Sequence, residues 1–250
     1  MMTKKKISKT VYEDYCNLYD LFKSRETPFA DEGFRDETQI KIKYDSDKEQ
    51  ILIVWQDSRS KFDWIHTDLF FIPRIHYCKC KKDTPDCPTE IMLKHSGFDR
   101  AYDSIRSYVK RELDKIIANN PKCKRIIQYG HSLGAALATQ SHFMISQNYP
   151  DMILRTIITG SPRVFINPIL VPWTIVRWFK LRKHTTNIYS FRNKYDLIPK
   201  LPFVIIGYVH LVKGIKIGHT KFKDMFNPKE CPHIIEKYKI SLDEYFKDHN

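Results

Sequence analysis

Residues 124–140 constrain the fold of this chain more than any other stretch. An apolar run, residues 125–129, meets the pentapeptide Gly130-His131-Ser132-Leu133-Gly134, and small helix-forming residues follow. A Gly-X-Ser-X-Gly turn between a strand and a helix is typical of a nucleophile elbow, and its glycines let the two elements pass close together. The pattern therefore predicts a strained Ser132 whose hydroxyl leaves the turn at a helix N-terminus, where unpaired N–H groups can face an oxyanion.

The elements on both sides of this turn alternate between strands and helices. We expect a hairpin from residues 39–44 and 50–55, and a second one from residues 203–209 and 214–217. We expect the last ten residues to be frayed. Further strands are predicted at 91–95, 125–129, 154–159 and 187–192, and helices at 7–23, 99–119 and 135–148. This order predicts an α/β fold, of the α/β-hydrolase type, with a central, mostly parallel sheet flanked by helices.

Length and composition favour one domain over residues 1–250, with residues 1–37 as an N-terminal helical extension. No apolar run reaches the roughly 18 residues that a membrane span needs. The basic N-terminus is not followed by the apolar region of a secretory signal. The compartment stays open, and the expectation is a cytoplasmic or peripheral membrane protein.

The net charge of +13 favours anionic partners such as nucleic acid or anionic lipid. No nucleic-acid-binding motif accompanies the charge, so we expect no specific nucleic-acid binding. Residues 167–182 combine two tryptophans with several cations. This segment fits either a peripheral contact with an anionic membrane or lipid interface, or a buried helix with a basic tail.

Six cysteines are present, and three of them, Cys78, Cys80 and Cys87, lie close together. Their spacing lacks the paired knuckles of structural zinc sites, and no fourth ligand is evident. We therefore expect free thiols or a local disulfide there, and neither a metal nor a cofactor.

A serine hydroxyl needs a histidine to take its proton and an acid to orient that histidine. Asp196 follows a predicted strand, lies downstream of Ser132 and precedes two prolines, which makes it the preferred acid. His131 and His142 are poorly placed as bases, beside the nucleophile and on its helix. Four later histidines remain candidates for the base when the residues alone are considered: His210, His219, His233 and His249.

A series of motifs resembles the class 3 lipases, the family of fungal triacylglycerol lipases. The resemblance spans about residues 38–245. The matching pieces are residues 51–58, Asp63-Trp64, His95-Ser96-Gly97-Phe98, residues 130–138, Gly160-Ser161-Pro162-Arg163-Val164, residues 196–202, Gly207-Tyr208-Val209-His210, and His233 with Tyr238.

By this resemblance, Ser132 is the nucleophile and Asp196 is the acid of the triad. His210 corresponds to a histidine that is not catalytic in the family. The catalytic histidine of such lipases opens a C-terminal helix with an aromatic residue nearby, which favours His233 over His219.

The resemblance also implies an oxyanion hole and a lid. The backbone N–H groups of Ser58 and Leu133 correspond to the oxyanion hole, and residues 60–72 correspond to a short lid helix. One departure stands out, because the family usually has Arg-Gly where this chain has Gln56-Asp57. A carboxylate pointing inward there would oppose a developing oxyanion.

The resemblance implies a serine esterase, a carboxylic ester hydrolase that cleaves triacylglycerol or another acylglycerol through an acyl-enzyme. A phospholipase A-type esterase is one alternative. A catalytically weak lipid- or membrane-binding protein on a lipase fold is the other, and Asp57 together with the basic, Trp-rich segment favours it.

Overall fold

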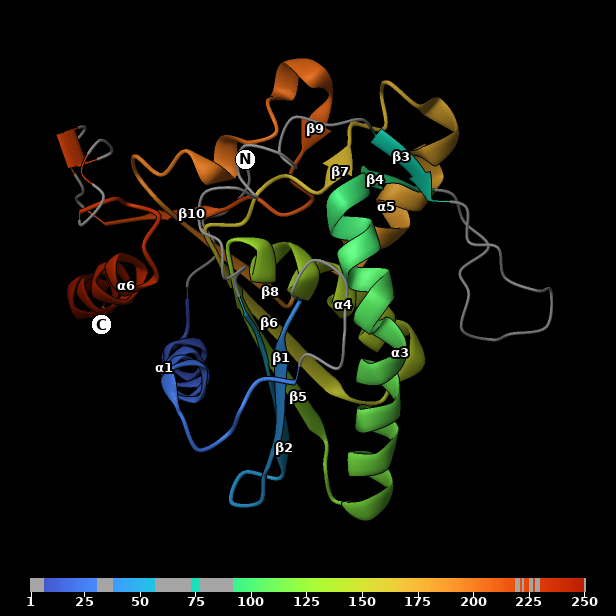
Figure 1. The fold of residues 1–250 in the computed structure, drawn as a ribbon, viewed down its shortest axis with the longest axis vertical. Helices are drawn as coiled ribbons and strands as arrows, with labels where there is room; N and C mark the ends of the chain where they lie inside the picture. Colours follow the sequence, from blue (N-terminus) through green and yellow to red (C-terminus); the bar gives the residue numbers. More distant parts are fainter. Residues whose placement is uncertain are drawn as a thin grey trace.

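A six-stranded, mostly parallel sheet forms the centre of the computed structural model (Figure 1). The structure describes residues 7–30, 38–56, 73–76, 92–218, 221, 223–224, 227 and 230–249. The strands run in the order β1-β2-β5-β6-β8-β10. They are β1 (Ile40–Asp45), β2 (Gln50–Trp55), β5 (Arg125–His131), β6 (Ile153–Thr159), β8 (Ile188–Asn193) and β10 (Ile215–Ile217). Only β1 is antiparallel to its neighbour, so the predicted first hairpin and the predicted mostly parallel sheet are confirmed.

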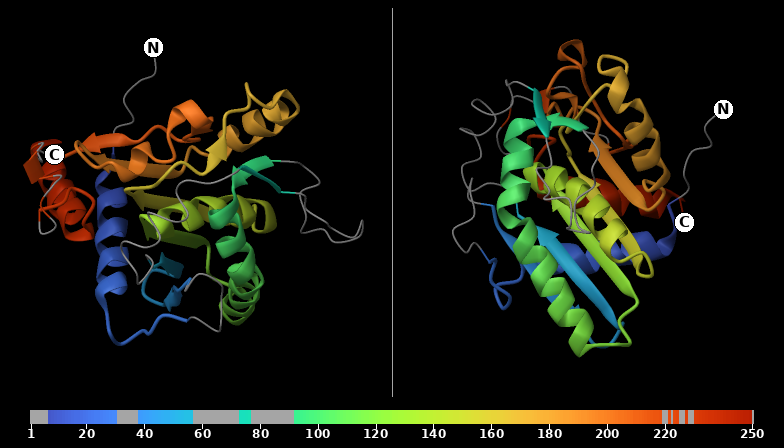
Figure 2. Two further views of the ribbon diagram at one scale, coloured as in Figure 1. Left: turned by 45° about the horizontal axis from the view of Figure 1, so that its top comes forward. Right: turned by 90° about the vertical axis from the view of Figure 1, so that its right-hand side faces the viewer.

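Helices cover both faces of this sheet. On one face lie α3 (Ser96–Asn119), α4 (Leu133–Asn148) and α5 (Ile175–Lys183), and on the other lie α1 (Lys9–Lys23) and α6 (Ile235–His249) (Figures 1 and 2). The central strands are largely apolar because both faces of the sheet are buried. In β2, Ile51 and Ile53 pack with α3 and α4, while Leu52 and Val54 pack with α1 and α6.

A small second sheet lies beyond the upper ends of the parallel strands (Figure 1). It is antiparallel and contains β3 (Pro73–His76), β4 (Met92–His95), β7 (Phe165–Ile166) and β9 (Tyr208–Val209). The short helical turns η2 (Pro172–Thr174), η3 (Ile198–Lys200) and η4 (Val204–Ile206) belong to the same end of the molecule.

The helix α1 is tied to the sheet by charged groups as well as by apolar packing. Its Asp14 carboxylate is buried and forms ion pairs with Arg125 on β5 and Arg155 on β6. Lys41 of β1 donates to the carbonyl oxygens of Leu21, at 3.0 Å, and Ser24, at 2.6 Å, and so satisfies carbonyls at the end of α1. A buried carboxylate and a buried ammonium group are tolerated here because each has specific partners.

The predicted second hairpin is wrong. Residues 203–209 contain η4 and then β9, and β9 pairs with β7 in the second sheet. In contrast, β10 pairs in parallel with β8 at the edge of the main sheet. Both segments are short apolar runs, and local sequence does not encode which distant strand such a run will pair with.

The predicted frayed C-terminus is also wrong, since α6 continues to His249. Tyr238, Leu242 and Phe246 recur every four residues and are all buried. Apolar residues at this spacing form one stripe on a helix, and the ring of Phe246 stacks on Tyr12 of α1 with centroids 4.4 Å apart. The C-terminal helix is therefore part of the core.

Phe246→Ala is expected to lower the free energy of unfolding by about 3–5 kcal/mol, because it leaves a cavity between α1 and α6. Lys247→Ala, at an exposed neighbouring position, should change it by less than about 0.5 kcal/mol. Urea unfolding of both variants measures the difference, and equal stabilities would contradict this role for α6.

Candidate active site

The turn between β5 and α4 has the strained geometry that the sequence predicts. Ser132 adopts φ 54° and ψ −120°, a conformation that is rare for residues other than glycine. A Cβ placed on Gly130 would lie 2.1 Å from the Gly134 carbonyl oxygen, and one placed on Gly134 would lie 2.5 Å from the Trp55 carbonyl oxygen. Both glycines are therefore required where β5, α4 and the end of β2 meet.

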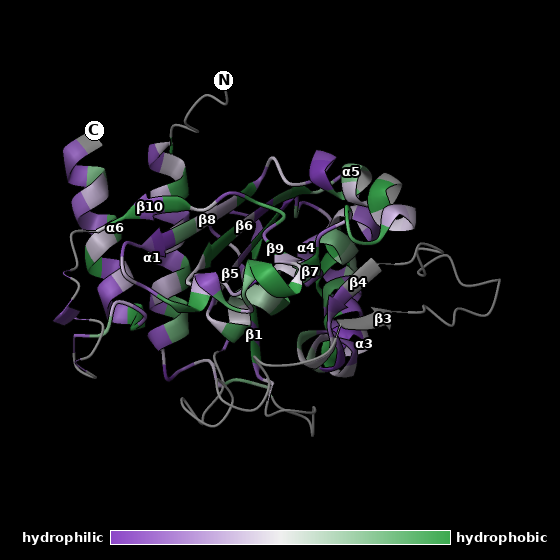
Figure 3. Ribbon diagram, turned by 90° about the horizontal axis from the view of Figure 1, so that it is seen from above, coloured by the Kyte–Doolittle hydropathy of each residue, from purple (hydrophilic) through white to green (hydrophobic). Residues whose placement is uncertain are grey.

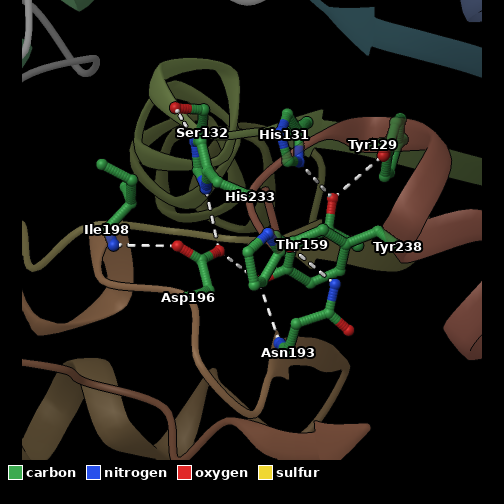
Figure 4. A network of polar contacts seen from close by, with 10 residues as sticks. Tyr129, His131, Ser132, Thr159, Asn193, Asp196, Ile198, His233 and Tyr238 are labelled. Atoms are coloured by element: carbon green, nitrogen blue, oxygen red, sulfur yellow. Dashed lines mark hydrogen bonds and ion pairs between the residues drawn. The ribbon is translucent and has the colours of Figure 1, made fainter. Parts of the chain in front are cut away.

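Ser132, His233 and Asp196 form a chain of hydrogen bonds (Figure 4). His233 Nε2 lies 2.8 Å from Ser132 Oγ, and His233 Nδ1 lies 2.8 Å from Asp196 Oδ2. With Nδ1–H donating to the carboxylate, Nε2 is left to accept the serine proton. The serine follows β5, the aspartate lies in the loop after β8, and the histidine lies two residues before the start of α6. Three segments that are distant in the sequence therefore meet at this point.

The carboxylate of Asp196 is buried and has two further donors. Its Oδ1 accepts from the backbone N–H of Ile198 at 2.9 Å, and its Oδ2 accepts from the Tyr238 hydroxyl at 2.6 Å (Figure 4). Burial and the adjacent carboxylate raise the pKa of Tyr238 well above its ordinary value, so the phenol remains a donor. These bonds fix the orientation of the carboxylate that faces His233.

Asn193 connects this carboxylate to the segment that carries the histidine. Its backbone N–H donates to the Tyr238 hydroxyl at 3.1 Å, and its side-chain amide donates to the carbonyl of Pro232 at 2.7 Å. No sequence motif pointed to Asn193. An amide at the end of a strand carries no local signal of a partner that lies 39 residues further along the chain.

The far side of the His233 ring is covered by His131. The two ring centroids lie 4.8 Å apart, and His131 Nδ1 is 3.0 Å from Thr159 Oγ1, which in turn lies 2.9 Å from the Tyr129 hydroxyl (Figure 4). His131 is thus held in place as a packing partner of His233, in keeping with its expected unsuitability as a base.

Gly160 limits the space on another side of the His233 ring. It has φ +62°, and a Cβ placed on it would lie 2.9 Å from His233 Cε1 and 3.2 Å from His131 Cε1. A side chain at position 160 would therefore push the imidazole away from its observed position. In the sequence, Gly160 belongs to a motif shared with the family, and the motif alone gives it no role.

Gly160→Ala is expected to lower kcat for a soluble ester by about 100-fold, because a small displacement of a reacting group is enough for such a loss. Gly214→Ala is the matched control, since a Cβ there has its nearest neighbour in the flexible Arg192 side chain, at 3.2 Å. Steady-state kinetics of both variants, alongside their thermal unfolding, tests the effect. Unchanged kcat in Gly160→Ala would contradict the proposed steric role.

Several residues singled out from the sequence lie outside the described part of the chain. These are Asp57, Ser58, the lid segment 60–72, Cys78, Cys80, Cys87 and His219. Leu133 is the first residue of α4 and is buried. Its N–H belongs to the first turn of the helix, where backbone donors have no partner within the helix. A Cβ built on Gly134 would lie 3.1 Å from the carbonyl oxygen of Gln56, the residue that follows β2.

His210 is not part of the hydrogen-bonded chain. Its Nε2 donates to the Pro199 carbonyl at 2.6 Å. Burial lowers the pKa of His210 to about 4, and the guanidinium groups of Arg163 and Arg192 act in the same direction. The folded protein therefore holds His210 neutral at pH values where an exposed histidine would be charged.

Stability is expected to fall below pH 6.5 because of His210. Between pH 6.5 and about 4 the unfolded chain binds a proton at His210 that the folded protein excludes. The contribution of His210 to the free energy of unfolding is therefore fully present above pH 6.5 and is lost as the pH falls toward 4. The loss should amount to about 2–3 kcal/mol. Urea unfolding at pH 7 and pH 4.5 should show a weaker pH dependence in His210→Gln than in wild type, whereas the exposed-site variant His184→Gln should match wild type.

Within the described residues, no group of three His, Cys, Asp or Glu side chains is arranged to hold a metal ion. Of the helices described, none is both long enough and apolar enough to cross a membrane.

Comparison with known proteins identifies the family. Residues 52–205, more than half of the chain, match the family model described as lipase (class 3). The chain belongs to the class 3 lipase family. The resemblance recognised in the sequence is thereby confirmed.

Two similar proteins are the secreted mono- and diacylglycerol lipases A of Penicillium cyclopium and Penicillium camembertii. Each is 27% identical over 184 residues, which covers 73% of this chain and 52% of the relative. This class 3 lipase chain thus spans about half the length of the curated relatives it matches.

Solved structures of fungal lipases share the fold. One fungal lipase superposes with a TM-score of 0.63 at 22% identity, covering 86% of this chain and 83% of the other. A triacylglycerol lipase described as having a serine protease triad at its catalytic centre superposes with a TM-score of 0.59 at 23% identity, covering 78% and 66%. These likenesses confirm the predicted α/β-hydrolase fold.

Proposed function

We propose that this class 3 lipase chain is a serine hydrolase that cleaves carboxylic ester bonds of acylglycerol lipids. The observation that carries the proposal is the chain of 2.8 Å contacts from Ser132 through His233 to Asp196. A nucleophile, a base and an orienting acid in this order are the parts that acyl transfer requires.

In the proposed reaction, Ser132 Oγ attacks the ester carbonyl while His233 Nε2 takes the serine proton. The tetrahedral intermediate then expels the alcohol, which leaves with the proton from His233, and an acyl-enzyme remains. Water attacks the acyl-enzyme as His233 takes one of its protons, and the fatty acid departs as Ser132 is regenerated. The Asp196 carboxyl group accepts the hydrogen bond from His233 Nδ1 throughout and stabilises the imidazolium that forms in each step.

The oxyanion of each tetrahedral intermediate needs two preorganised donors. We assign these to the N–H groups of Leu133 and Ser58. The start of α4 supports the first assignment, because Leu133 is the first residue of the helix and follows the serine directly. The close approach of Trp55 and Gln56 to Gly134 supports the second, since Ser58 follows two residues later.

Acylglycerols are the preferred substrates because the relatives are named as mono- and diacylglycerol lipases. A phospholipase A-type esterase uses the same chemistry on a different lipid and remains the nearest alternative. A catalytically weak lipid-binding protein is a separate alternative, motivated by Asp57, whose carboxylate would oppose the oxyanion if it pointed inward.

A fluorophosphonate probe is expected to label Ser132 covalently in the folded protein. Ser132→Ala should lose all labelling, and Ser132→Ala and Asp196→Asn should each lower ester hydrolysis by about 10⁴-fold or more. Mass spectrometry of the labelled peptide and assays on acylglycerols and phospholipids measure these effects.

Ser141→Ala provides the control, because Ser141 is a buried serine further along the same helix. It should label and hydrolyse like wild type. Undiminished hydrolysis by Ser132→Ala would overturn the mechanism, and a folded wild-type protein that does not label would favour the lipid-binding alternative.

A further inference from the structure

The loop that follows Asp196 depends on donors from outside for most of its backbone hydrogen bonds. Residues 197–202 include Pro199 and Pro202, which have no N–H group to donate. The first two carbonyl groups of the loop accept from backbone N–H groups of the loop itself, at 2.8 and 2.9 Å. The carbonyl groups of the next four residues accept from two residues elsewhere in the chain, Arg163 and His210.

Arg163 binds three of these four carbonyl groups. Its Nη1 donates to Lys200 and, at 2.7 Å, to Pro202, and its backbone N–H donates to Leu201 at 2.7 Å. A guanidinium group carries its N–H donors in one rigid plane, so a single side chain can bind two carbonyls that are two residues apart. Burial and the nearby Arg192 guanidinium lower the pKa of Arg163, and the carbonyl oxygens offset this unfavourable environment of the charge.

His210 binds the fourth carbonyl group, that of Pro199, through its Nε2 at 2.6 Å. The second sheet brings this histidine next to Arg163. Its strands β7 and β9 are antiparallel and lie side by side, with Phe165 opposite Val209 (Figure 3). Arg163 comes two residues before β7, and His210 directly follows β9. Because residues before one antiparallel strand lie beside residues after its partner, one small sheet presents both donors to the loop.

The loop that these donors hold is connected directly to the Asp196 carboxylate. The backbone N–H of Ile198, the first residue of η3, donates to Asp196 Oδ1 at 2.9 Å, and η3 ends at a residue whose carbonyl Arg163 binds. A shift of η3 would therefore move this donor and turn the carboxylate, whose Oδ2 lies 2.8 Å from His233 Nδ1. The hydrogen bonds to the loop thus maintain a contact within the candidate active site.

We propose that Arg163 and His210 are positioning residues, which hold the loop after Asp196 so that its carboxylate orients His233. This inference rests on the proposed hydrolysis, in which the same carboxylate stabilises the imidazolium. The two residues act through Asp196 and not on the substrate. Their loss is therefore expected to lower kcat and to leave KM unchanged.

Arg163→Gln and Arg163→Lys are each expected to lower kcat for a soluble ester by about tenfold or more, because a small displacement of a catalytic group is enough for such a loss. The backbone N–H of residue 163 still binds Leu201 in both variants, so one anchor of the loop is kept. His210→Leu should also lower kcat by about tenfold. His210→Gln keeps an N–H donor and should lower kcat less than His210→Leu does.

Arg125→Gln is the control for a purely structural effect. It removes an ion pair with the buried Asp14, and it lies at the start of β5, whereas Ser132 follows the end of that strand. This variant should lower the free energy of unfolding in urea but keep the kcat of wild type. A rise in KM in the Arg163 variants in place of the fall in kcat would overturn the inference, in favour of a role in substrate binding.

The proton on His233 Nδ1 provides a measurement that does not depend on turnover. Hydrogen bonding to a carboxylate gives such a proton a downfield NMR resonance, which is assigned by its absence in His233→Ala. The resonance should weaken or move upfield in Arg163→Gln and His210→Leu, and stay in place in Arg125→Gln.

An unchanged resonance and wild-type kcat in folded Arg163→Gln and His210→Leu would overturn the inference. A wild-type protein that neither hydrolyses esters nor reacts with a fluorophosphonate would contradict the proposed function instead. The resonance would then still show whether Arg163 and His210 orient Asp196 toward His233.

Discussion

Three backbone segments pack against one another at the serine turn, and this close packing determines the geometry of the candidate site. The end of β2, the turn after β5 and the first turn of α4 approach so closely that no side chain fits at Gly130 or Gly134. Ser132 is forced into a conformation that costs about 1–3 kcal/mol, and only surrounding packing maintains such strain. The result is a hydroxyl held beside the start of a helix, at the edge where the parallel strands end.

A second set of interactions brings the other polar groups to that hydroxyl. Asp196 accepts from Tyr238 and from the Ile198 N–H, while Asn193 holds both Tyr238 and the carbonyl before His233. The position of His233 therefore depends on α6, whose stripe of Tyr238, Leu242 and Phe246 is buried against the sheet and α1. Stability of the C-terminal helix and geometry of the candidate site are consequently coupled.

Much of the fold was predictable because it depends on local patterns. The largely apolar strands, the helix spacing and the Gly-X-Ser-X-Gly turn led to the prediction of a mostly parallel sheet with a strained serine, and the structure agrees. The incorrect predictions concern long-range contacts. Residues 203–217 looked like a hairpin, but their two strands belong to different sheets, and the C-terminal residues looked frayed although they cover α1. Neither partner is encoded near these residues in the chain.

Segment 167–182 also shows the difference between what local sequence predicts and what long-range contacts determine. Sequence composition allowed both a buried helix and a segment at a lipid interface, and the structure contains features of each. Trp178 and Leu181 are buried in the core, whereas Trp173 and Phe179 are exposed. Which side of a short helix faces the core depends on what packs against it, and composition does not contain that information.

Local sequence was enough to predict the elbow, the strained serine and the choice of Asp196, since glycine sterics and the strand–turn–helix order act over a few residues. It left four histidines open as the base until a family resemblance favoured one. Only the tertiary structure brings His233 to 2.8 Å from both Ser132 and Asp196 and adds Asn193 and Gly160 around it. These contacts join residues that are dozens of positions apart in the chain, so their geometry exists only once the sheet has assembled.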